Sequence, residues 1–401
     1  MATAEPALAP KFDVADPQLR TDPYAVYARL RAAGLCRGAP GQWVVTRHAD
    51  VAALLRDPRL TKQLPAEYYR VAGAAPRLEA FLARMNMGRR DGDLARRVGR
   101  AFRAPHVQSL HARMEELLDE LLAPLAERRE FDLARELALP FPMMVMCELL
   151  GIPASDRDAV WPRAATLLAS FSDAAFLSER DLGEGERALD WLVDYLSALL
   201  AERRRRPAED LVSSLASSSE HDRMLTDEEI VDSVIRVFYA GFETSKGMLA
   251  NGVAALLERP DEHRRLLHDR TLVPPAVEEF LRYDAPIQVS LRRVLEPIRL
   301  GERTLRSGRV LVLLIGSANH DESAFAEPSR LDVARRPNPH LSFGGGPSFC
   351  LGAALARQEG AVALRGLLDR FRSIAPAGPV RRPPLVNLRC VEALPVAVRP
   401  R

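Results

Sequence analysis

The sequence has few cysteines and no pair of them in metal-binding spacing. Its four cysteines, Cys36, Cys147, Cys350 and Cys390, are scattered over 401 residues. Such spacing does not build a disulfide framework, and without a CxxC pair it does not predict a structural zinc site. Cys147 stands in an apolar run, where we expect a small buried side chain. Only Cys350 stands in an unusual setting, a stretch rich in glycine.

Long apolar runs and an excess of one charge are also absent. No stretch reaches the roughly 18 uninterrupted apolar residues that a membrane span needs. Residues 1–13 show no apolar run after a positive segment, so they do not predict a signal peptide. Lysine is rare, but acidic and basic residues are interleaved and the net charge is only +2. We therefore expect a cytoplasmic protein that binds neither membrane nor nucleic acid.

Strand signals are sparse, whereas helical periodicity runs through most of the chain. Short strands are expected at 43–46 and 311–315, and hairpins over 294–310 with turns at Gly301 and Gly308. We find no internal repeat and no low-complexity linker. The sequence therefore predicts one mainly α-helical domain with small β-sheets over residues 1–401. Helices are expected at 23–33, 51–55, 114–126, 186–205, 226–257 and 352–371.

The segment from His340 to Gly352 places four glycines around Cys350. Glycine reaches backbone conformations closed to other residues and lets a flat ligand approach the main chain. A predicted helix follows at once, and its positive end would favour a thiolate, which can ligate iron. Two other interpretations stay open. The loop could bind phosphate, although the GxGxxG and GxxxxGK patterns are absent, or Cys350 could be buried and inert.

The long helix predicted in the middle of the chain carries a second unusual pattern. Residues 226–229 have the form of a capping box, which starts a helix of some 30 residues that Pro260 ends. At 1.5 Å per residue it would span roughly 45 Å. Within it, Gly241 weakens the helix, and Glu243 and Thr244 interrupt an apolar run. Such a conflict between local preference and pattern is typical of a functional site.

Four motifs, in order, resemble those of the cytochrome P450 family, and the resemblance extends over nearly the whole chain. The sequence AGFET at 240–244 resembles its oxygen-activation motif, EFLR at 279–282 its ExxR motif, and ANHD at 318–321 a segment common in bacterial members. The resemblance implies the cytochrome P450 fold, haem b, and a monooxygenase that uses dioxygen and two electrons. The spacing of Phe343, Gly346, Ser348, Cys350 and Gly352 resembles the haem-binding signature of the family.

The resemblance also implies a haem site. Cys350 would be the iron ligand, and Arg292 and His340 would bind the haem propionates. Two departures stand out, because the family usually has Arg or His where Ser348 stands and an HxxxR motif where 91–95 reads DGDLA. Either Arg96 or Arg97 is expected to substitute for the second loss. The remaining expected haem contacts are Phe343, Gly344, Gly352 and Ala240.

Thr244 and Glu243 match the chemistry of oxygen activation, which needs two protons delivered through an ordered relay. Thr244 would donate a hydrogen bond toward dioxygen at the iron, and Glu243 would connect it to solvent. The other interpretation is a threonine bonded back to the preceding turn and a glutamate on an exposed face. This pair distinguishes a monooxygenase from a mere haem-binding module. The alternative function is a haem-binding protein that recruits or senses without oxygenating, or one with atypical oxidative chemistry.

Glu279 and Arg282 are spaced to meet on one helix face. The family bonds this pair to a further arginine before the cysteine loop. Arg330 matches that position best, with Arg335 and Arg336 as alternatives. The other interpretation is an exposed ion pair of little energetic weight.

The substrate is poorly encoded. Arg236 shares a helix face with Ala240 and Thr244, and it would bind a substrate anion or pair with Asp232. The family also draws substrate contacts from Gln288, Val289 and Ser290. Its stand-alone bacterial members often tailor natural products such as antibiotics. We therefore expect a small organic substrate, free or tethered to a carrier protein.

Without a fused reductase, the chain is expected to receive electrons from a ferredoxin and a ferredoxin reductase. The partner would dock on the cysteine side, where Arg103, Arg357 and the surface around Arg282 could meet acidic groups.

Overall fold

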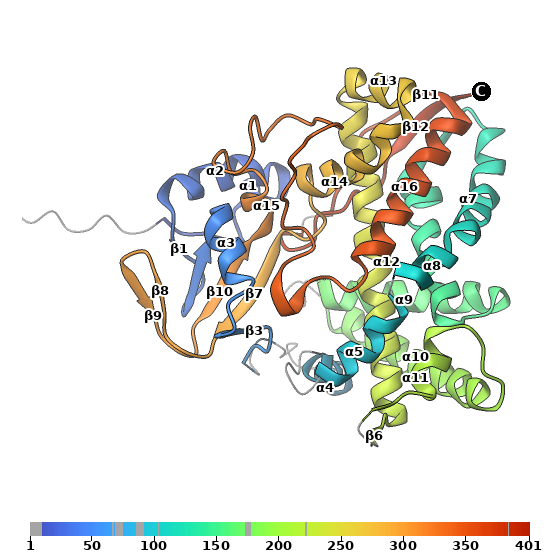
Figure 1. Cartoon of the computed structure of the whole chain (residues 1–401), viewed down its shortest axis with the longest axis horizontal. Helices are drawn as coiled ribbons and strands as arrows, with labels where there is room; N and C mark the ends of the chain where they lie inside the picture. The colour runs from blue at the N-terminus through green and yellow to red at the C-terminus, as the bar shows by residue number, and fades with distance from the viewer. Residues whose placement is uncertain are drawn as a thin grey trace, which may run out of the picture.

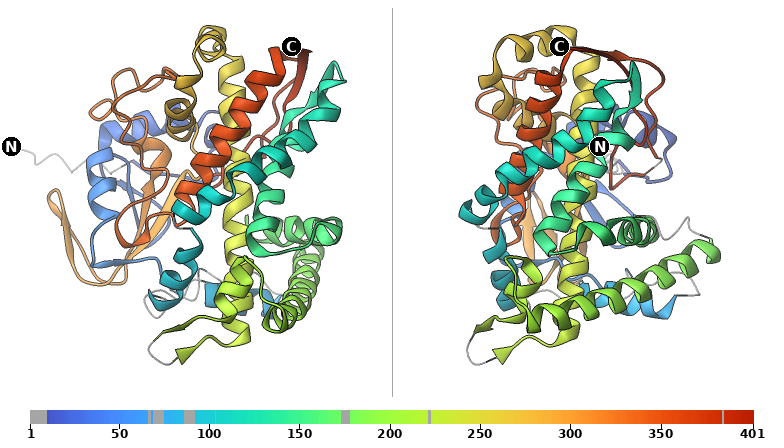
Figure 2. Two further views of the ribbon diagram at one scale, coloured as in Figure 1. Left: turned by 45° about the vertical axis from the view of Figure 1, so that its right-hand side comes forward. Right: turned by 90° about the vertical axis from the view of Figure 1, so that its right-hand side faces the viewer.

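A computed structural model describes residues 10–65, 68, 75–85, 92–102, 104–172, 178–220, 223–383 and 385–401. A part rich in β-strands lies beside a helical part, and α12 runs through the latter (Figures 1 and 2). The helices are α1 (Pro17–Thr21), α2 (Pro23–Ala33), α3 (His48–Leu54), α4 (Pro76–Met85), α5 (Gly92–Ala101), α6 (Ala104–Ser109), α7 (His111–Ala126), α8 (Pro140–Leu150), α9 (Arg157–Ser172), α10 (Glu179–Arg205), α11 (Leu211–Ala216), α12 (Asp227–Leu257), α13 (Pro260–His268), α14 (Val273–Tyr283), α15 (Ile315–Ala318) and α16 (Ala353–Arg370), with the shorter turns η2 (Ala134–Ala138), η3 (Ala154–Asp156), η5 (Arg270–Leu272) and η6 (Gly346–Ser348).

The central helix confirms its sequence prediction. The Thr226 hydroxyl accepts a hydrogen bond from the Glu229 amide, and the Glu229 carboxylate accepts one from the Thr226 amide, which completes the capping box. The helix has 31 residues. Gly241 also has a packing reason, because a Cβ there would lie 2.4 Å from Met146 Sδ on α8. The glycine therefore lets α8 and α12 approach closely.

Two larger sheets join segments from opposite ends of the sequence. The five-stranded sheet has the order β1-β2-β10-β7-β3, and β12 is the middle strand of the three-stranded sheet β11-β12-β4. Two hairpins, β5-β6 and β8-β9, complete the set, the second turning at Gly301 as predicted. The strands are β1 (Cys36–Arg37), β2 (Gln42–Val45), β3 (Leu60–Thr61), β4 (Glu130–Asp132), β5 (Ser219–Glu220), β6 (Arg223–Met224), β7 (Val289–Val294), β8 (Ile298–Leu300), β9 (Arg303–Leu305), β10 (Val310–Leu314), β11 (Phe371–Pro376) and β12 (Pro395–Pro400).

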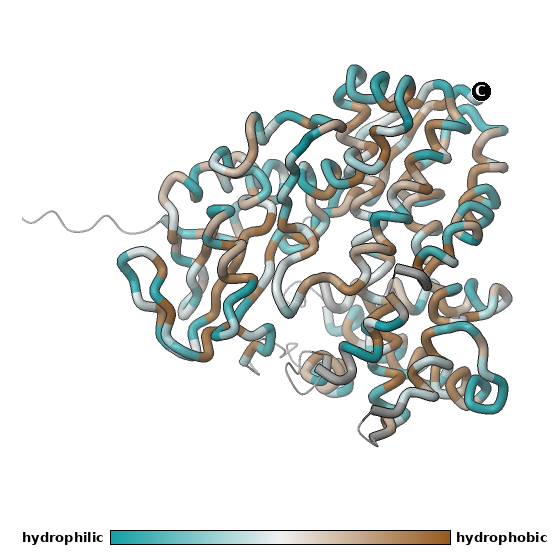
Figure 3. The backbone as a smooth tube through the Cα atoms, viewed as in Figure 1, coloured by the Kyte–Doolittle hydropathy of each residue, from teal (hydrophilic) through white to brown (hydrophobic). Residues whose placement is uncertain are grey.

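Both faces of the five-stranded sheet are covered. Every residue of β10 is buried, as its continuous apolar run predicts for a central strand. On one face, Leu311 and Leu313 pack with Val51 and Leu54 of α3. On the other, Val312 and Leu314 pack with residues of α1 and α2. Figure 3 shows hydrophobic and hydrophilic residues alternating along the surrounding helices, as expected when one side of each faces a core.

The fold class predicted from the sequence is confirmed, since helices dominate and the sheets are small. The predicted helix at 23–33 coincides with α2, whereas α10 begins at Glu179, several residues earlier than its predicted start. In the described part of the chain, no helix is long and apolar enough to cross a membrane.

Candidate functional site

The cysteine loop is fixed by its own backbone. The Cys350 amide donates to the Phe343 carbonyl oxygen at 2.9 Å. Gly344 and Gly346 adopt positive φ angles of 71° and 62°, where other residues are strained. A Cβ on Gly346 would also lie 2.8 Å from Arg56 Cα. The loop therefore lies tightly against the end of α3, just before Cys350 leads into α16.

The Cys350 thiol is free and accessible. Burial raises its pKa, while a hydrogen bond from the Gly352 amide and the charges of Lys62 and Arg357 lower it. The expectation that the helix end favours the thiolate is therefore only partly met, because desolvation outweighs the cations. Binding of a metal ion would remove the thiol proton.

The surroundings of the thiol fit a haem. Large exposed apolar side chains are rare in the described residues, and two of the five, Phe349 and Leu351, flank Cys350. Such exposure is typical of a surface that packs against a ligand or partner. Phe343, the first residue of the signature, is buried beneath the loop.

Arg292 supplies a second cation, near Lys62, whose charge in turn acts on the thiol. Burial lowers its pKa to about 10. Its Nη1 donates to Ser290 Oγ and to the Leu291 carbonyl oxygen, both at 2.8 Å, and the described residues give it no carboxylate partner. A buried guanidinium bonded only to neutral groups can take an anion such as a propionate. A thiol, apolar flanks and such a cation are what the iron, the ring and a propionate of haem require.

His340 does not support its predicted role. Its Nε2 lies 3.1 Å from Glu278 Oε2, and its Nδ1 accepts a hydrogen bond from the Ser342 amide. The same carboxylate receives two hydrogen bonds from Arg357, at 2.6 and 2.9 Å. Burial raises the pKa of Glu278, but the hydrogen bonds from His340 and Arg357 lower it to about 2. Both ring nitrogens of His340 therefore serve the protein, which leaves neither for a propionate.

The two arginines predicted to substitute for the HxxxR motif differ in their surroundings. Arg97 is buried and donates to the Ser218 carbonyl oxygen at 2.7 Å, so it joins α5 to the segment after α11. Arg96 is exposed on α5, and its role at a propionate stays a prediction. Asp91 and Arg103 lie outside the described residues.

Glu279 and Arg282 are fully buried, which excludes the interpretation as an exposed ion pair. Two hydrogen bonds of 2.7 and 2.8 Å join them. Arg282 also donates to the carbonyl oxygens of Asn319 and Pro328. The pair therefore ties α14 to the segments that lead into the cysteine loop.

The third arginine of this network is Arg335, and the choice of Arg330 was wrong. Arg335 Nε lies 3.1 Å from both carboxylate oxygens of Glu279. The Arg330 side chain is exposed and pairs with Glu327, and only the Arg330 carbonyl oxygen joins the network, where it accepts from Arg282 and Arg335. Counting along the chain could not show this, because the direction of each side chain depends on the turn after Glu327, which has a positive φ.

The ANHD segment connects this network to the loop. Asn319 Oδ1 accepts from the Leu341 amide, and its Nδ2 donates to Ser342 Oγ, both at 2.8 Å. Asp321 accepts from the His48 amide at the start of α3. These side chains therefore fix the position of the loop relative to α3 and α14.

On α12, the predicted oxygen-activation residues lie on a turn of the helix that is accessible at Ala240. Ala240 is exposed, and the Thr244 hydroxyl donates to its carbonyl oxygen at 2.9 Å. Glu243 does not lie on an exposed face, since its side chain is 13% exposed and its Oε1 accepts from Lys246 Nζ at 2.8 Å. The back-bonded threonine is thus present, and the glutamate is held by a lysine that the sequence analysis did not consider.

This turn of α12 is joined by a hydrogen bond to α16, the helix that follows Cys350. The Ser245 hydroxyl donates to the Glu359 carboxyl group in α16, and both side chains are buried. Because α16 begins three residues after Cys350, this hydrogen bond ties the part of α12 that carries Glu243 and Thr244 to the helix that follows the cysteine loop. Burial raises the pKa of Glu359 to about 8, although the bond from Ser245 lowers it.

We expect Glu359 to make stability depend on pH. Between about pH 4.5 and 8 this residue ionises in the unfolded chain but stays protonated in the folded one, so the free energy of unfolding falls as pH rises. The slope is at most about 1.4 kcal/mol per pH unit. Glu359→Gln should reduce the difference in urea-induced unfolding between pH 5 and 8, and the exposed Glu127→Gln should not. Equal slopes in wild type and Glu359→Gln would contradict this expectation.

Arg236 is not paired with Asp232. Asp232 instead accepts two hydrogen bonds from Arg84 of α4, the shorter being 2.7 Å, and Arg236 Nη2 donates to the Arg84 carbonyl oxygen at 3.5 Å. Binding of a substrate anion by Arg236 stays a prediction.

The three residues predicted to contact substrate, which lie in β7 and just before it, have different environments. Gln288 is 1% exposed and donates to Ala285 and Tyr24, so it was wrong to expect substrate contact there. Val289 packs toward the core beneath α1 and α2, away from Arg292. Ser290 shares the face of Arg292 and accepts its hydrogen bond.

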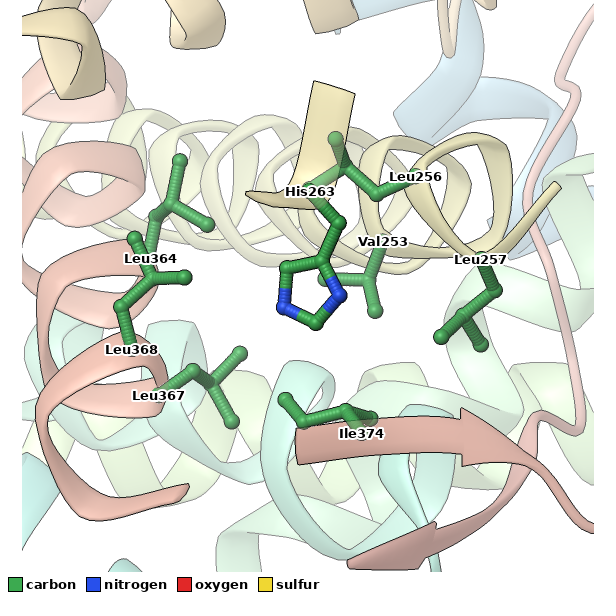
Figure 4. Close-up of a pocket in the computed structure, with 8 residues that line it drawn as sticks. All are labelled: Val253, Leu256, Leu257, His263, Leu364, Leu367, Leu368 and Ile374. Carbon is green, nitrogen blue, oxygen red and sulfur yellow. The ribbon is translucent and has the colours of Figure 1, made fainter. Parts of the chain in front are cut away.

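A small cavity elsewhere in the helical part is not a substrate site. It has a volume of about 10 Å³, room for at most one water. Figure 4 shows the His263 ring pointing into a gap surrounded by apolar side chains from α12, α16 and β11. Burial lowers the pKa of His263, and the charge of Arg270 lowers it further. The gap is a packing feature between helices.

Known proteins are similar to this chain in sequence and in fold. The family model for cytochrome P450 matches residues 93–386. Cytochrome P450 107B1 from Saccharopolyspora erythraea is 33% identical over 400 residues, covering 95% of this chain and 96% of the relative. Cytochrome P450 monooxygenase PikC from Streptomyces venezuelae is 34% identical over 392 residues, covering 94% and 91%.

A solved structure extends the likeness to three dimensions. The structure of P450BioI in complex with hexadec-9Z-enoic acid ligated acyl carrier protein has a TM-score of 0.86 at 30% identity, covering 95% of this chain and 100% of that one. With the family match over well more than half of the sequence and relatives covering nearly all of it, this chain belongs to the cytochrome P450 family of haem b monooxygenases.

Proposed function

We propose that this chain oxygenates a small organic substrate of bacterial secondary metabolism, with Cys350 as the iron ligand. One observation carries the proposal most directly. The Ser245–Glu359 hydrogen bond joins the Glu243–Thr244 step of α12 to the helix that starts just after the thiol. The turn of α12 that carries the residues suited to proton delivery is therefore held against the helix that follows the residue suited to iron ligation. Bound haem supplies the iron at which dioxygen is activated and one oxygen atom is inserted into the substrate.

The protein side chains have distinct tasks in this proposal. Cys350 donates electron density through its thiolate, and the Gly352 amide, which bonds the sulfur, tunes that donation. Arg292 holds a propionate. Glu243, held by Lys246 Nζ, passes protons taken up from solvent toward Thr244 Oγ1, which keeps acceptor capacity while it donates to Ala240. The accessible Ala240 leaves room for substrate beside this relay.

We expect Thr244→Ala to uncouple electron use from product formation. Without the hydroxyl, protons reach the oxygen in a less ordered way, and loss of a proton-transfer group typically costs 10²- to 10⁴-fold. Product formed per NADPH consumed should fall by roughly that order, while NADPH consumption continues. The measurement is product and NADPH in the same reaction with a surrogate ferredoxin and its reductase.

Ser233→Ala is the matched control for Thr244→Ala. Ser233 lies on α12 and donates back to the Glu229 carbonyl oxygen, as Thr244 does to Ala240, but it is three turns away. Its removal should leave coupling unchanged. Equal coupling in wild type and Thr244→Ala would contradict the proposed relay.

The reduced, CO-bound absorption spectrum tests the class of site. A strongly red-shifted Soret band requires haem ligated by thiolate, and its absence in folded protein would overturn the proposal. A haem-binding protein without oxygenase activity would give this band but no substrate-dependent consumption of NADPH with ferredoxin.

The identity of the substrate is addressed by ligand screening for a low- to high-spin shift. A related P450 has been solved with a ligated acyl carrier protein, so each candidate acid should be offered both free and as a carrier thioester. We propose ferredoxin and ferredoxin reductase as electron donors. Arg357 ion-pairs with Glu278 but its side chain stays 42% exposed, so we propose docking on it and on the surface around the buried Arg282.

A further inference from the structure

Lys62 directly follows β3, the strand that pairs with β7 beside Arg292. In the antiparallel pair of β3 and β7, Leu60 faces Val294 and Thr61 faces Arg293. The pairing ends at Thr61, so Lys62 is the first residue beyond β3 and comes one position after the partner of Arg293. Arg292 is a buried residue on one face of β7. That face also carries Val294 and Leu311, which pack with Leu55 beneath the cysteine loop.

Two neighbouring cations repel each other. The pKa of Lys62 is lowered, first by burial and then by the charge of Arg292, whereas Cys350 raises it. The Lys62 ammonium group is therefore near both the guanidinium and the sulfur. Within the described part of the chain, neither cation forms an ion pair with a carboxylate, and Lys62 is accessible. An anion bound between the two cations would attract both of them and so offset their mutual repulsion.

We infer that Lys62 and Arg292 together bind one carboxylate group, a propionate of the haem. The inference rests on the proposed function, because it requires haem at Cys350. It also accounts for a departure noted in the sequence, since the family's HxxxR arginine is replaced by Ala95 and the signature cation by Ser348. Arg97, the other cation near that position, is committed to Ser218. Lys62 thus supplies, from just beyond β3, a charge that the motif has lost.

The test is Lys62→Met in the haem-loaded, substrate-free protein. The haem should transfer to excess apomyoglobin at least about tenfold faster than from wild type, as expected for the loss of one charge-assisted hydrogen bond. The propionate bending band in the resonance Raman spectrum should also shift. Lys62→Arg keeps the charge and should lie between the two in both measurements.

Lys11→Met is the matched control, because Lys11 is an exposed lysine paired with Asp13 at 3.2 Å. It should leave the haem transfer rate and the Raman band unchanged. If wild type shows the red-shifted CO band while Lys62→Met has the wild-type transfer rate and Raman band, the inference is wrong and the proposed function stands. Absence of the CO band in wild type would instead overturn the proposed function itself.

A substrate carboxylate is the other source of the same chemistry. If Lys62 served the substrate, Lys62→Met would leave both haem measurements unchanged and would weaken only the spin shift produced by carboxylic acid ligands. That pattern would overturn the assignment to the propionate. A change in both haem measurements without any substrate present supports it.

Discussion

A Cys350→Ser variant is expected to lose the red-shifted Soret band of the reduced CO complex and to form almost no product. The hydroxyl of serine stays protonated near neutral pH, so it cannot replace a thiolate that donates electron density to the iron. Loss of residues that only support metal ligands costs 10- to 100-fold, so loss of the ligand should lower product formation by more than about 100-fold. The measurements are the CO difference spectrum and the rate of product formation.

Cys36→Ala provides the control for this variant. Cys36 is a free, buried cysteine on the far side of the five-stranded sheet, where it packs with residues of α1 and α2. The variant should keep the red-shifted band even if the protein is somewhat less stable. A Cys350→Ser protein that folds and keeps the band would show that another residue ligates the iron.

The second large effect concerns stability. Arg335→Ala should lower the free energy of unfolding by about 2–4 kcal/mol, because it removes one of the two guanidinium groups that bond the buried Glu279 carboxylate. The same side chain also donates to the carbonyl oxygens of Ala326, Glu327 and Arg330, which would lose a partner. Urea-induced unfolding of the holo protein measures the change.

Arg330→Ala is the matched comparison for Arg335→Ala. It removes the same side-chain type five residues earlier, but from an exposed pair with Glu327, so we expect a change within about 0.5 kcal/mol. A larger loss in Arg330→Ala than in Arg335→Ala would show that the network is assigned to the wrong arginine.

The helical framework could be read from the sequence because its signals are local. The capping box at Thr226 and the proline at 260 lie next to the ends they set, and α12 follows them. The continuous apolar run of β10 likewise predicts a buried central strand. The resemblance also brought the right motifs together, since the ExxR pair, the ANHD segment and the cysteine loop contact one another.

The sequence did not predict contacts between segments that are far apart along the chain. The two-residue strand β3 has no pattern of its own, so only its pairing with β7 shows that Lys62 comes near Arg292. Asp232 is taken by Arg84 from another helix, and His340 by Glu278. In each case the partner is separated by many residues and chosen by side-chain direction, which spacing along one helix or loop cannot supply.

The strand order also determines when the protein can finish folding during synthesis. Glu130 of β4 pairs with Ala397 of β12, and Val44 of β2 pairs with Val312 of β10, so roughly 270 residues separate the members of each pair. At about 5–20 residues per second, the ribosome needs on the order of 10–50 s to cover that distance. Throughout this interval β2 and β4 lack these partners, and unpaired strands are prone to associate with other chains. The growing chain is therefore most exposed to aggregation, and most dependent on chaperones, until β10 and β12 have emerged.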